Sequence, residues 1–579
     1  MDTLTLIKNR MQELNPLHLR MDKTRERVYN TPYVMPSLSD PSKPMDNVIN
    51  VTMPYAAIIA NTVINDLMTS FRQTIVDGDI SATSRVYIEG FVNNNRDEAD
   101  ELLVNSSWHA SLKEIWCSHV CIRSFIGVRW VSQIIDGKYV IDILPMDMRY
   151  VSYEYGNDGQ NWVNNRTFRP KWLLEQRYAK QLEKKGASLH GDSNVDIQVD
   201  DWWSSERKEL YIGGDLLIDQ KNPFGEPPFV IAAPATGFML RDKEYIEHDS
   251  EDILYLVRGV LDELNRTASI EQTKGAETIR PPYIQETPQE DSKPAKGVPT
   301  TGQVKKYKAG EQPQLLQTPD INNAFLTGRA DLSKIVQMGG VNDIDLGNVS
   351  QTVSAVWITA QAGIRKKFSG PRLKAIAQGD QQLARLMIRQ AKKAVELESG
   401  SPDIIVGGMG RKKTYSADKL GDPDKYGVRI ELRSQSKTEE IANLAQYEAA
   451  QDLPTRWRLE HILGVDDPDA IIREMDFEEA KRMDPAIGLS EDGISLAREA
   501  EDIEDEEEAD LMKLQSMMLI ERAVALLKER LNPSPVALPG QETKPKQLTQ
   551  GKPLVQLPKL LEGVSEANTP QQPREVAAQ

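Results

Sequence analysis

The chain has 579 residues, enough for three or four domains at ~150 residues each, and a formal net charge of −17. Its 39% hydrophobic and 27% charged residues are ordinary for a water-soluble globular chain. The negative charge argues against a protein that wraps nucleic acid by neutralising phosphates, because such proteins are usually basic. Any DNA contact must then be made in passing, or by a few local cations.

Cys117 and Cys121 are the two cysteines of the chain, too few for a disulfide scaffold. Their spacing matches neither a CxxC pair nor a paired zinc pattern. We expect buried thiols on a helix, with a metal site or a redox pair as the alternative. This cysteine usage favours a reduced, intracellular protein.

The sequence gives no sign of membrane insertion. The first residues lack the basic start and the apolar core of a signal peptide. The two longest uncharged stretches, 47–65 and 346–364, contain too many polar residues to span a bilayer. We therefore expect a soluble protein without a membrane partner.

The first 236 residues change from a helical to a strand pattern. Residues 1–120 show helical spacing of apolar residues, with a polar break at 93–97. From 121 to 236, Asp136-Gly137 and Gly213-Gly214 each separate two apolar runs, which predicts two β-hairpins. The proline-rich stretch 222–231 breaks the chain and restarts it.

A long helix is predicted over 250–278. Ser250 is a suitable N-cap, and the acids that follow it are favourable in a first helical turn. The apolar stripe of its first half gives way to small and polar residues: Thr267, Ser269, Thr273 and Ala276. A stripe that fades in this way suggests a helix that leaves its domain core and packs on identical neighbours.

The next segments predict an excursion and a return. A proline-rich stretch, 281–320, contains one short strand pattern at 303–307, and a helix from about 321 to 338 brings the chain back. A glycine-containing loop leads to a very long helix, about 353–398, which we expect to be kinked at Gly370-Pro371.

Helices return over 438–530, with a turn near 464–468 and an amphipathic helix over 511–531. The apolar face expected for that helix consists of Met517, Ile520, Val524, Leu527 and Leu531. From residue 532 no apolar period remains, and a disordered tail is predicted.

Charge is distributed unevenly along the chain. Residues 353–395 contain nine Lys/Arg and one acid, whereas residues 491–510 contain eleven acids and one arginine. The two segments could attract each other between subunits or domains. The alternative, two solvated helix faces, stays open.

The sequence contains no recognisable catalytic, metal-binding or cofactor-binding motif. The glycine-rich stretch 407–414 lacks the Walker spacing, so a turn is the better interpretation. Histidines are scattered singly, without HExxH, and GxSxG is absent. Asp343 and Asp345 lack the ligand ladder of a calcium loop. We therefore predict a non-enzyme with no metal and no cofactor.

The order of these parts resembles the portal protein of tailed bacteriophages, a family of ring-shaped connectors. The resemblance covers about residues 20 to 530, and it rests on the sequence of segments rather than on any one motif. It implies an α+β, mainly helical fold of the phage-portal type in a ring oligomer. The implied parts are an N-terminal wing (1–249), an outgoing stem helix (250–278), a clip (279–320), a returning stem helix (321–338), a tunnel loop (339–352), a spine helix with the remaining wing (353–437), a helical crown (438–531) and a disordered tail (532–579).

This resemblance implies a function and two sets of site residues. Portal proteins form dodecameric rings at one capsid vertex, pass double-stranded DNA during packaging and ejection, and bind terminase and then a tail adaptor. The tunnel loop would comprise Gly339, Gly340, Val341, Asn342, Asp343, Ile344, Asp345, Leu346 and Gly347. The residues of the clip that would dock the motor and adaptor are Lys293, Lys296, Lys305, Lys306, Tyr307 and Lys308.

Charge patterns agree with this implication without proving it. A net-negative ring lets DNA slide, because tight phosphate neutralisation would stall it. The lysines at 305, 306 and 308 could contact phosphates, or they could protect a solvent-facing strand edge. Further implied partners are the major capsid and scaffolding proteins, in the virion and, during assembly, in the host cytoplasm. The alternative is another phage head, connector or internal core protein.

Overall fold

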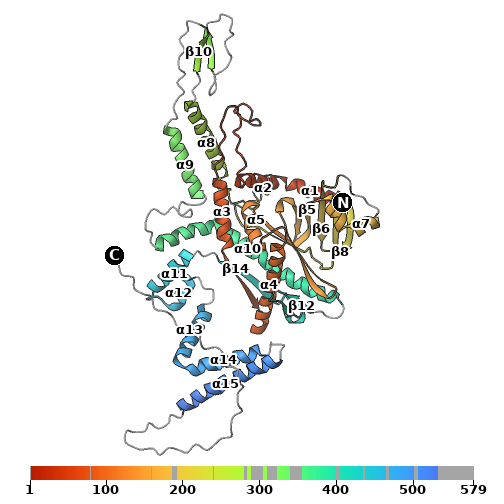
Figure 1. The fold of residues 1–579 in the computed structure, drawn as a ribbon, viewed down its shortest axis with the longest axis vertical. Coiled ribbons are helices and arrows are strands. Elements are labelled where there is room, and N and C mark those ends of the chain that lie inside the picture. Colours follow the sequence, from red (N-terminus) through yellow and green to blue (C-terminus); the bar gives the residue numbers. More distant parts are fainter. Residues whose placement is uncertain are drawn as a thin grey trace, which may run out of the picture. The chain divides into compact units, whose positions relative to one another are not determined.

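Figure 1 shows the computed structural model, which divides into two compact units, Met1–Gly464 and Val465–Gln579. The described residues are 2–78, 80–157, 159–185, 189, 192–238, 240–279, 283–287, 304–308, 323–339, 355–398, 403–433, 437–463, 468–500 and 506–531. Helical residues make up 53% of the chain and strand residues 21%, which confirms a mixed α+β protein in which helix predominates.

The elements of the first unit follow the predicted order, from helices to strands and back to helices. The helices are α1 (Thr3–Glu13), α2 (Asn15–Val28), α3 (Tyr55–Met68), α4 (Ala82–Val104), α5 (Leu112–Ile122), α6 (Lys171–Arg177), α7 (Ala179–Lys185), α8 (Arg258–Ile279), α9 (Asn323–Gly339), α10 (Ala355–Leu397), α11 (Lys437–Ala449) and α12 (Thr455–His461), with the 3-10 turns η1 (Met148–Tyr150), η2 (Tyr245–His248) and η3 (Asp418–Leu420). The strands are β1 (Phe71–Gly78), β2 (Ile126–Ile135), β3 (Lys138–Pro145), β4 (Val151–Gly156), β5 (Gly159–Pro170), β6 (Asp196–Ser204), β7 (Arg207–Ile212), β8 (Asp215–Lys221), β9 (Phe229–Ala232), β10 (Tyr283–Thr287), β11 (Val304–Lys308), β12 (Ile404–Val406), β13 (Lys413–Tyr415) and β14 (Tyr426–Arg433).

Both predicted hairpins are confirmed. β2 and β3 pair up to Ile135 and Lys138, and the intervening Asp136 and Gly137 have φ angles of 51° and 73°. Positive φ at both turn residues is the geometry that an Asp-Gly step favours. Gly213 and Gly214 likewise join β7 to β8. The sheets have the orders β3-β2-β9 and β4-β5-β6-β7-β8.

The polar break predicted at 93–97 is wrong. α4 runs through these residues without interruption, and Asn95 and Arg96 are buried. The Asn95 side chain donates to the Phe91 carbonyl oxygen and accepts from the Tyr139 hydroxyl. Asn95 thus has one partner in its own helix and one on β3, and Arg96 lies 3.4 Å from the Asp380 carboxylate, so polarity did not end the helix.

One strand lies within the region that we predicted to be mainly helical. β1 pairs antiparallel with β14, from Phe71 opposite Arg433 to Gly78 opposite Tyr426. The partner strand is more than 300 residues away in the sequence, so no local pattern announces the pairing.

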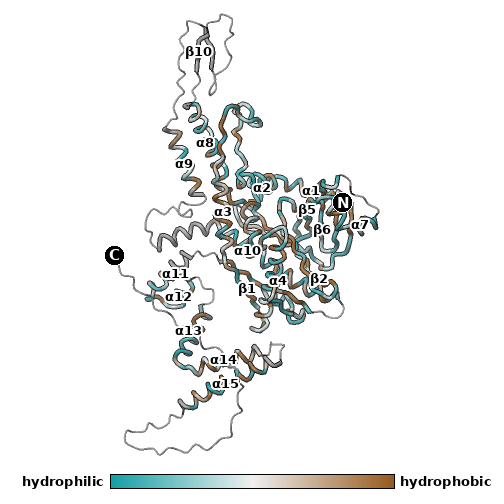
Figure 2. Tube along the Cα trace, viewed as in Figure 1, coloured by the Kyte–Doolittle hydropathy of each residue, from teal (hydrophilic) through white to brown (hydrophobic). Residues whose placement is uncertain are grey.

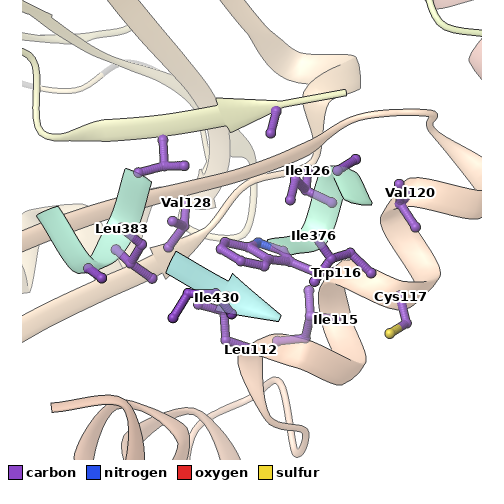
Figure 3. Close-up of a cluster of buried hydrophobic side chains, with 14 of the residues drawn as sticks. Leu112, Ile115, Trp116, Cys117, Val120, Ile126, Val128, Ile376, Leu383 and Ile430 are labelled. Atoms are coloured by element: carbon purple, nitrogen blue, oxygen red, sulfur yellow. The ribbon is translucent and has the colours of Figure 1, made fainter. Parts of the chain in front are cut away.

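The main core is built around Trp116 of α5, which is fully buried (Figure 3). Side chains from α5, β2, α10 and β14 surround it, and α10 packs closely on β2, since a Cβ at Gly379 would lie 2.6 Å from the Ile126 side chain. Figure 2 shows hydrophobic segments concentrated in this part of the unit. The core therefore ties the long helix α10 to the first half of the chain.

The long helix predicted from 250 begins later, at Arg258. Ser250 has a positive φ of 53° and does not cap a helix; its hydroxyl lies 3.0 Å from the Ser124 carbonyl oxygen. The Ile253 amide donates to the Cys121 carbonyl oxygen. Residues 250–257 are thus bonded to the end of α5, and tertiary contacts override the local helical preference.

The next elements agree with the predicted excursion and return. α9 covers the returning helix, β11 covers the strand pattern and pairs in parallel with β10, and α10 extends through Pro371. The described residues give no measure of the kink expected at that proline. The tail, 532–579, lies outside the described residues.

The second unit consists of helices in its described part: α13 (Pro468–Met483), α14 (Pro485–Glu499) and α15 (Glu506–Leu531). The predicted helix over 511–531 is confirmed, but its expected apolar face is not buried. Met517 is 63% exposed and Val524 is 41% exposed. The buried residues of α15 are instead small: Ala509, Ser516 and Ala523. Gly493 of α14 lets α15 approach closely, since a Cβ there would lie 2.7 Å from the Ile520 side chain.

Candidate functional site

The paired helices α8 and α9 cover most of the segments predicted as the outgoing and returning helices. The start of α8 is fixed to α2 by a buried polar cluster. Arg20 donates to the carbonyl oxygens of Asp249 at 3.1 Å and Ser250 at 2.7 Å, and lies 3.4 Å from the Glu251 carboxylate. The Thr24 hydroxyl donates to the Asp252 carboxylate at 2.7 Å.

Because this cluster is buried, the loss of any of its charged partners would cost free energy of folding. Desolvation lowers the pKa of the Arg20 guanidinium, while the neighbouring Glu251 and Asp252 carboxylates favour its charged form. A buried cation that lost these partners would be left uncompensated. The cluster therefore holds the segment that leads into α8 in one position on α2.

The apolar residues predicted for the first part of this segment are buried, as expected. They are Ile253, Leu254, Val257, Leu261 and Leu264. Among the described residues of α8, Ala268 is the last buried apolar one. The second half of the helix is held by polar groups.

A segment far away in sequence supplies those polar contacts. The chain between α2 and α3 doubles back at 36–44 and then runs along α8 (Figure 1). We call residues 49–53 the strap. The amides of Ile49, Val51 and Met53 donate to the side chains of Thr273, Ser269 and Asn265, at 3.0, 2.9 and 2.8 Å respectively.

The spacing of the strap follows from elementary geometry. Four helical residues rise ~6 Å, and two residues of an extended chain span ~6.6 Å, so alternate strap amides meet every fourth helix residue. Each hydroxyl also donates within the helix, Ser269 to the Asn265 carbonyl oxygen at 2.8 Å and Thr273 to that of Ser269 at 2.7 Å. Helix and strap are thereby locked in one register.

This finding changes the interpretation of the small polar face of α8. The sequence suggested that these residues pack on identical neighbours. Ser269 and Thr273 instead accept hydrogen bonds from the chain's own strap. Any neighbouring copy must contact other residues of α8, or the outer side of the strap.

α9 packs beside α8 (Figure 1). Arg329 of α9 forms an ion pair with Glu271 of α8. Val336 is buried and Leu332 packs against the main core, whereas Leu326 and Ile335 are exposed. One side of α9 near its end is therefore anchored, and Leu326 and Ile335 remain exposed.

The described half of α10 uses several of its charges internally. Asp380 is buried between Arg72 of β1, at 2.7 Å, and Arg96 of α4, at 3.4 Å. Arg389 pairs with Glu226 at 3.2 Å and with Asp424 at 3.5 Å. Arg372 is also buried, and desolvation lowers its pKa. The basic segment is thus not a uniformly solvated face.

The predicted tunnel loop falls almost entirely outside the described residues. Gly339 is the last residue of α9, and the rest of the predicted loop, 340–352, lies outside the described residues. Lys293 and Lys296 also lie outside it. Residues 305–308 are on β11, where Lys305 aligns with Ile284 and Tyr307 with Glu286 of β10.

The glycine-rich stretch 407–414 contains the turn between β12 and β13, as predicted. The amide of Gly407 donates to Glu98 at 3.1 Å and that of Met409 to Glu101 at 2.9 Å. These amides bind carboxylates of α4, which argues against a phosphate loop.

The predicted burial of the two thiols on a helix is confirmed. Cys117 and Cys121 lie on α5, and burial raises the pKa of each thiol to about 12. In the described part of the chain, no three His, Cys, Asp or Glu side chains are grouped so as to hold a metal ion. No described helix is both long and apolar enough to cross a membrane.

Sequence reasoning missed the strap and the Arg20 cluster. A signal for the strap exists, since Asn265, Ser269 and Thr273 recur at intervals of four on one helix face. Nothing in the sequence indicates that residues 49–53 are the partner. Comparison with known proteins adds no relative: no family model and no curated protein matches the chain significantly.

Proposed function

We propose that this protein is a structural portal subunit, which assembles into a ring-shaped DNA channel at one capsid vertex and catalyses no reaction. The observation that carries the proposal is the pair α8 and α9. The two helices pack together, flank the short β10-β11 pair in the sequence, and precede the 43-residue helix α10.

This arrangement suits a ring for a physical reason. Two helices that pack on each other and are rooted in one domain present two different sides to neighbouring copies. Contacts between unlike sides close into a ring when the rotation between copies allows it. Leu326 and Ile335 of α9 are exposed apolar residues available for such contacts. In the proposed ring, α8 and α9 surround the channel.

The partners proposed for the ring are DNA, terminase and a tail adaptor, with capsid and scaffolding proteins around it. The clip, 279–320, is the proposed docking surface for the motor and adaptor. It contains six basic and five acidic residues, so it would repel an acidic partner less than the rest of this acidic protein. Asp343 and Asp345 would form an acidic collar that keeps phosphates away from the channel wall.

Electron microscopy of the purified protein tests the proposal directly. We expect rings with an axial hole and a mass near twelve times the 65.1 kDa of one chain. A chain that stays monomeric at micromolar concentration and moderate salt would contradict the proposal. Particles without a hole would favour another head or core protein instead.

Two sets of variants separate assembly from DNA passage. Replacing Lys305, Lys306 and Lys308 with Glu should leave rings intact and abolish packaging. Replacing Asp343 and Asp345 with Lys should leave rings intact and slow DNA passage at low salt, because attraction to phosphates is salt-dependent. Packaging at the wild-type rate by either variant would remove those residues from the mechanism.

A further inference from the structure

A pocket of about 410 Å³ opens where α1, α2, η1 and β5 meet. These elements lie together beside the N-terminus (Figure 1). The lining residues are Lys8, Met11, Gln12, Asn15, His18, Arg149 and Arg166. The lining contains three cations, a histidine and two amides, and no acid. That composition is unusual on a chain whose net charge is −17.

The two arginines are held in place without using all their donors. The Nε of Arg149 donates to Asp22 at 2.8 Å, and the Nε of Arg166 donates to Asp200 at 2.9 Å. Within the described residues, the terminal nitrogens of both guanidinium groups have no hydrogen-bond partner. Lys8 is exposed and forms no ion pair with a described residue. Each guanidinium is already ion-paired with an aspartate, so the pocket offers oriented hydrogen-bond donors together with the charge of Lys8.

His18 is the decisive residue. Its side chain is only 2% exposed, yet it lines the pocket between α1, α2, η1 and β5. Its position is therefore fixed by the surrounding structure. A ligand in the pocket would lie beside the imidazole and could form a hydrogen bond with it.

We propose that this pocket binds a small molecule through a phosphate or similar oxyanion group. Arg149, Arg166 and Lys8 supply positive charge, and His18 and the amide side chains of Gln12 and Asn15 supply neutral hydrogen bonds. Guanidinium groups are well suited to phosphate oxygens, because they donate two parallel hydrogen bonds. The volume lies in the range of small-molecule sites.

The buried position of His18 favours a small ligand over a nucleic-acid backbone. Backbone phosphates contact exposed cations, and a duplex is too wide to follow a recess among helices. The proposal is independent of the portal function, since it concerns a pocket of the wing away from α8 and α9.

Neutral His18 fits this role. Burial, together with the positive charge of Arg149 and Arg123, lowers its pKa to about 4, against the opposing effect of Asp22 and Asp147. The ring is therefore uncharged at neutral pH and can donate one hydrogen bond. A bound anion would favour the protonated ring, so the contribution of His18 to binding should grow as the pH falls towards 5.

Calorimetric titration of the full chain with inorganic phosphate and pyrophosphate tests the proposal. We expect one site per chain and roughly tenfold weaker binding by Lys8→Gln, which removes one charged donor without disturbing the core. Lys138→Gln, an exposed lysine at the β2-β3 turn, is the matched control and should bind as the wild type does.

Two results would overturn the proposal. One is the absence of phosphate and pyrophosphate binding at millimolar concentration. The other is equal affinity in Lys8→Gln and Lys138→Gln. A His18→Gln variant that folds should also bind more weakly than the wild type, and this difference should widen as the pH falls towards 5. A short DNA duplex is titrated in the same way. If the duplex binds and the free anions do not, the small-ligand proposal is wrong.

Discussion

The strap on α8 provides the sharpest test of the structure. Ser269 is fully buried, and its hydroxyl accepts a hydrogen bond from the Val51 amide at 2.9 Å. In Ser269→Ala the helix keeps its backbone hydrogen bonds, but the Val51 amide loses its acceptor. An unsatisfied buried donor costs about 1–3 kcal/mol. Alanine also favours the helix slightly more than serine does, which offsets a few tenths of a kcal/mol.

The expected net effect is a loss of about 1–2 kcal/mol in the free energy of opening the strap. That corresponds to roughly five- to thirtyfold faster hydrogen exchange at the amides of the strap. The effect should be local, since the base of α8 is held separately by the Arg20 cluster. Amides of the main core, such as that of Trp116, should exchange at the wild-type rate.

Hydrogen exchange followed by mass spectrometry measures this change on peptides that contain residues 49–53. Thr278→Ala is the matched control, because the Thr278 hydroxyl donates only to the Lys274 carbonyl oxygen of its own helix. Its strap peptides should exchange as in the wild type. Equal exchange in Ser269→Ala and Thr278→Ala would refute the register of strap and helix.

Four further predictions follow from the same contacts. The pKa of His18 is about 4 in the folded chain and 6.5 in the unfolded chain, so only the unfolded state takes up a proton as the pH falls from 6.5 towards 4. Folding stability should therefore decrease by about 2 kcal/mol between pH 7 and pH 5, and denaturant titrations of His18→Gln should lack this part of the pH dependence. Asp380→Ala leaves its two arginine partners uncompensated and should cost about 3–5 kcal/mol in a denaturant titration, whereas the exposed Asp424→Asn should be nearly neutral. Cys117 and Cys121 should resist a thiol reagent at pH 8 until the chain unfolds; fast labelling of the native protein would contradict their burial. Truncation after residue 531 should leave the particle size unchanged in light scattering, because the composition of 532–579 lacks an apolar period that could bury surface.

The sequence alone determined those elements whose signals are local. The Asp136-Gly137 turn was predictable, because its two residues favour the positive φ angles that the hairpin requires. The helical pattern of α5 was predictable from the spacing of its apolar residues, and with it the burial of Cys117 and Cys121. Such signals depend on a few neighbouring residues, so no knowledge of distant partners is needed.

Tertiary structure decided whatever depends on a distant partner. Asn95 and Arg96 look like a polar break, yet they are buried, Asn95 accepting a hydrogen bond from Tyr139 and Arg96 forming an ion pair with Asp380. Residues 250–257 carry a helical pattern, yet hydrogen bonds to the end of α5 hold them in another conformation. In both places long-range hydrogen bonds outweigh a local preference worth less than about 1 kcal/mol per residue.

The candidate sites show the same difference between local and long-range signals. The order of segments was enough to suggest two paired helices with a small module between them, because helix periodicity and proline content are local properties. The strap and the His18 pocket could not be found in this way, since each brings together segments that are far apart in the sequence, by up to 224 residues for the strap. Their contacts exist only once the hydrophobic clusters have fixed α2, α8 and β5 in space, and that is information that the folded structure alone contains.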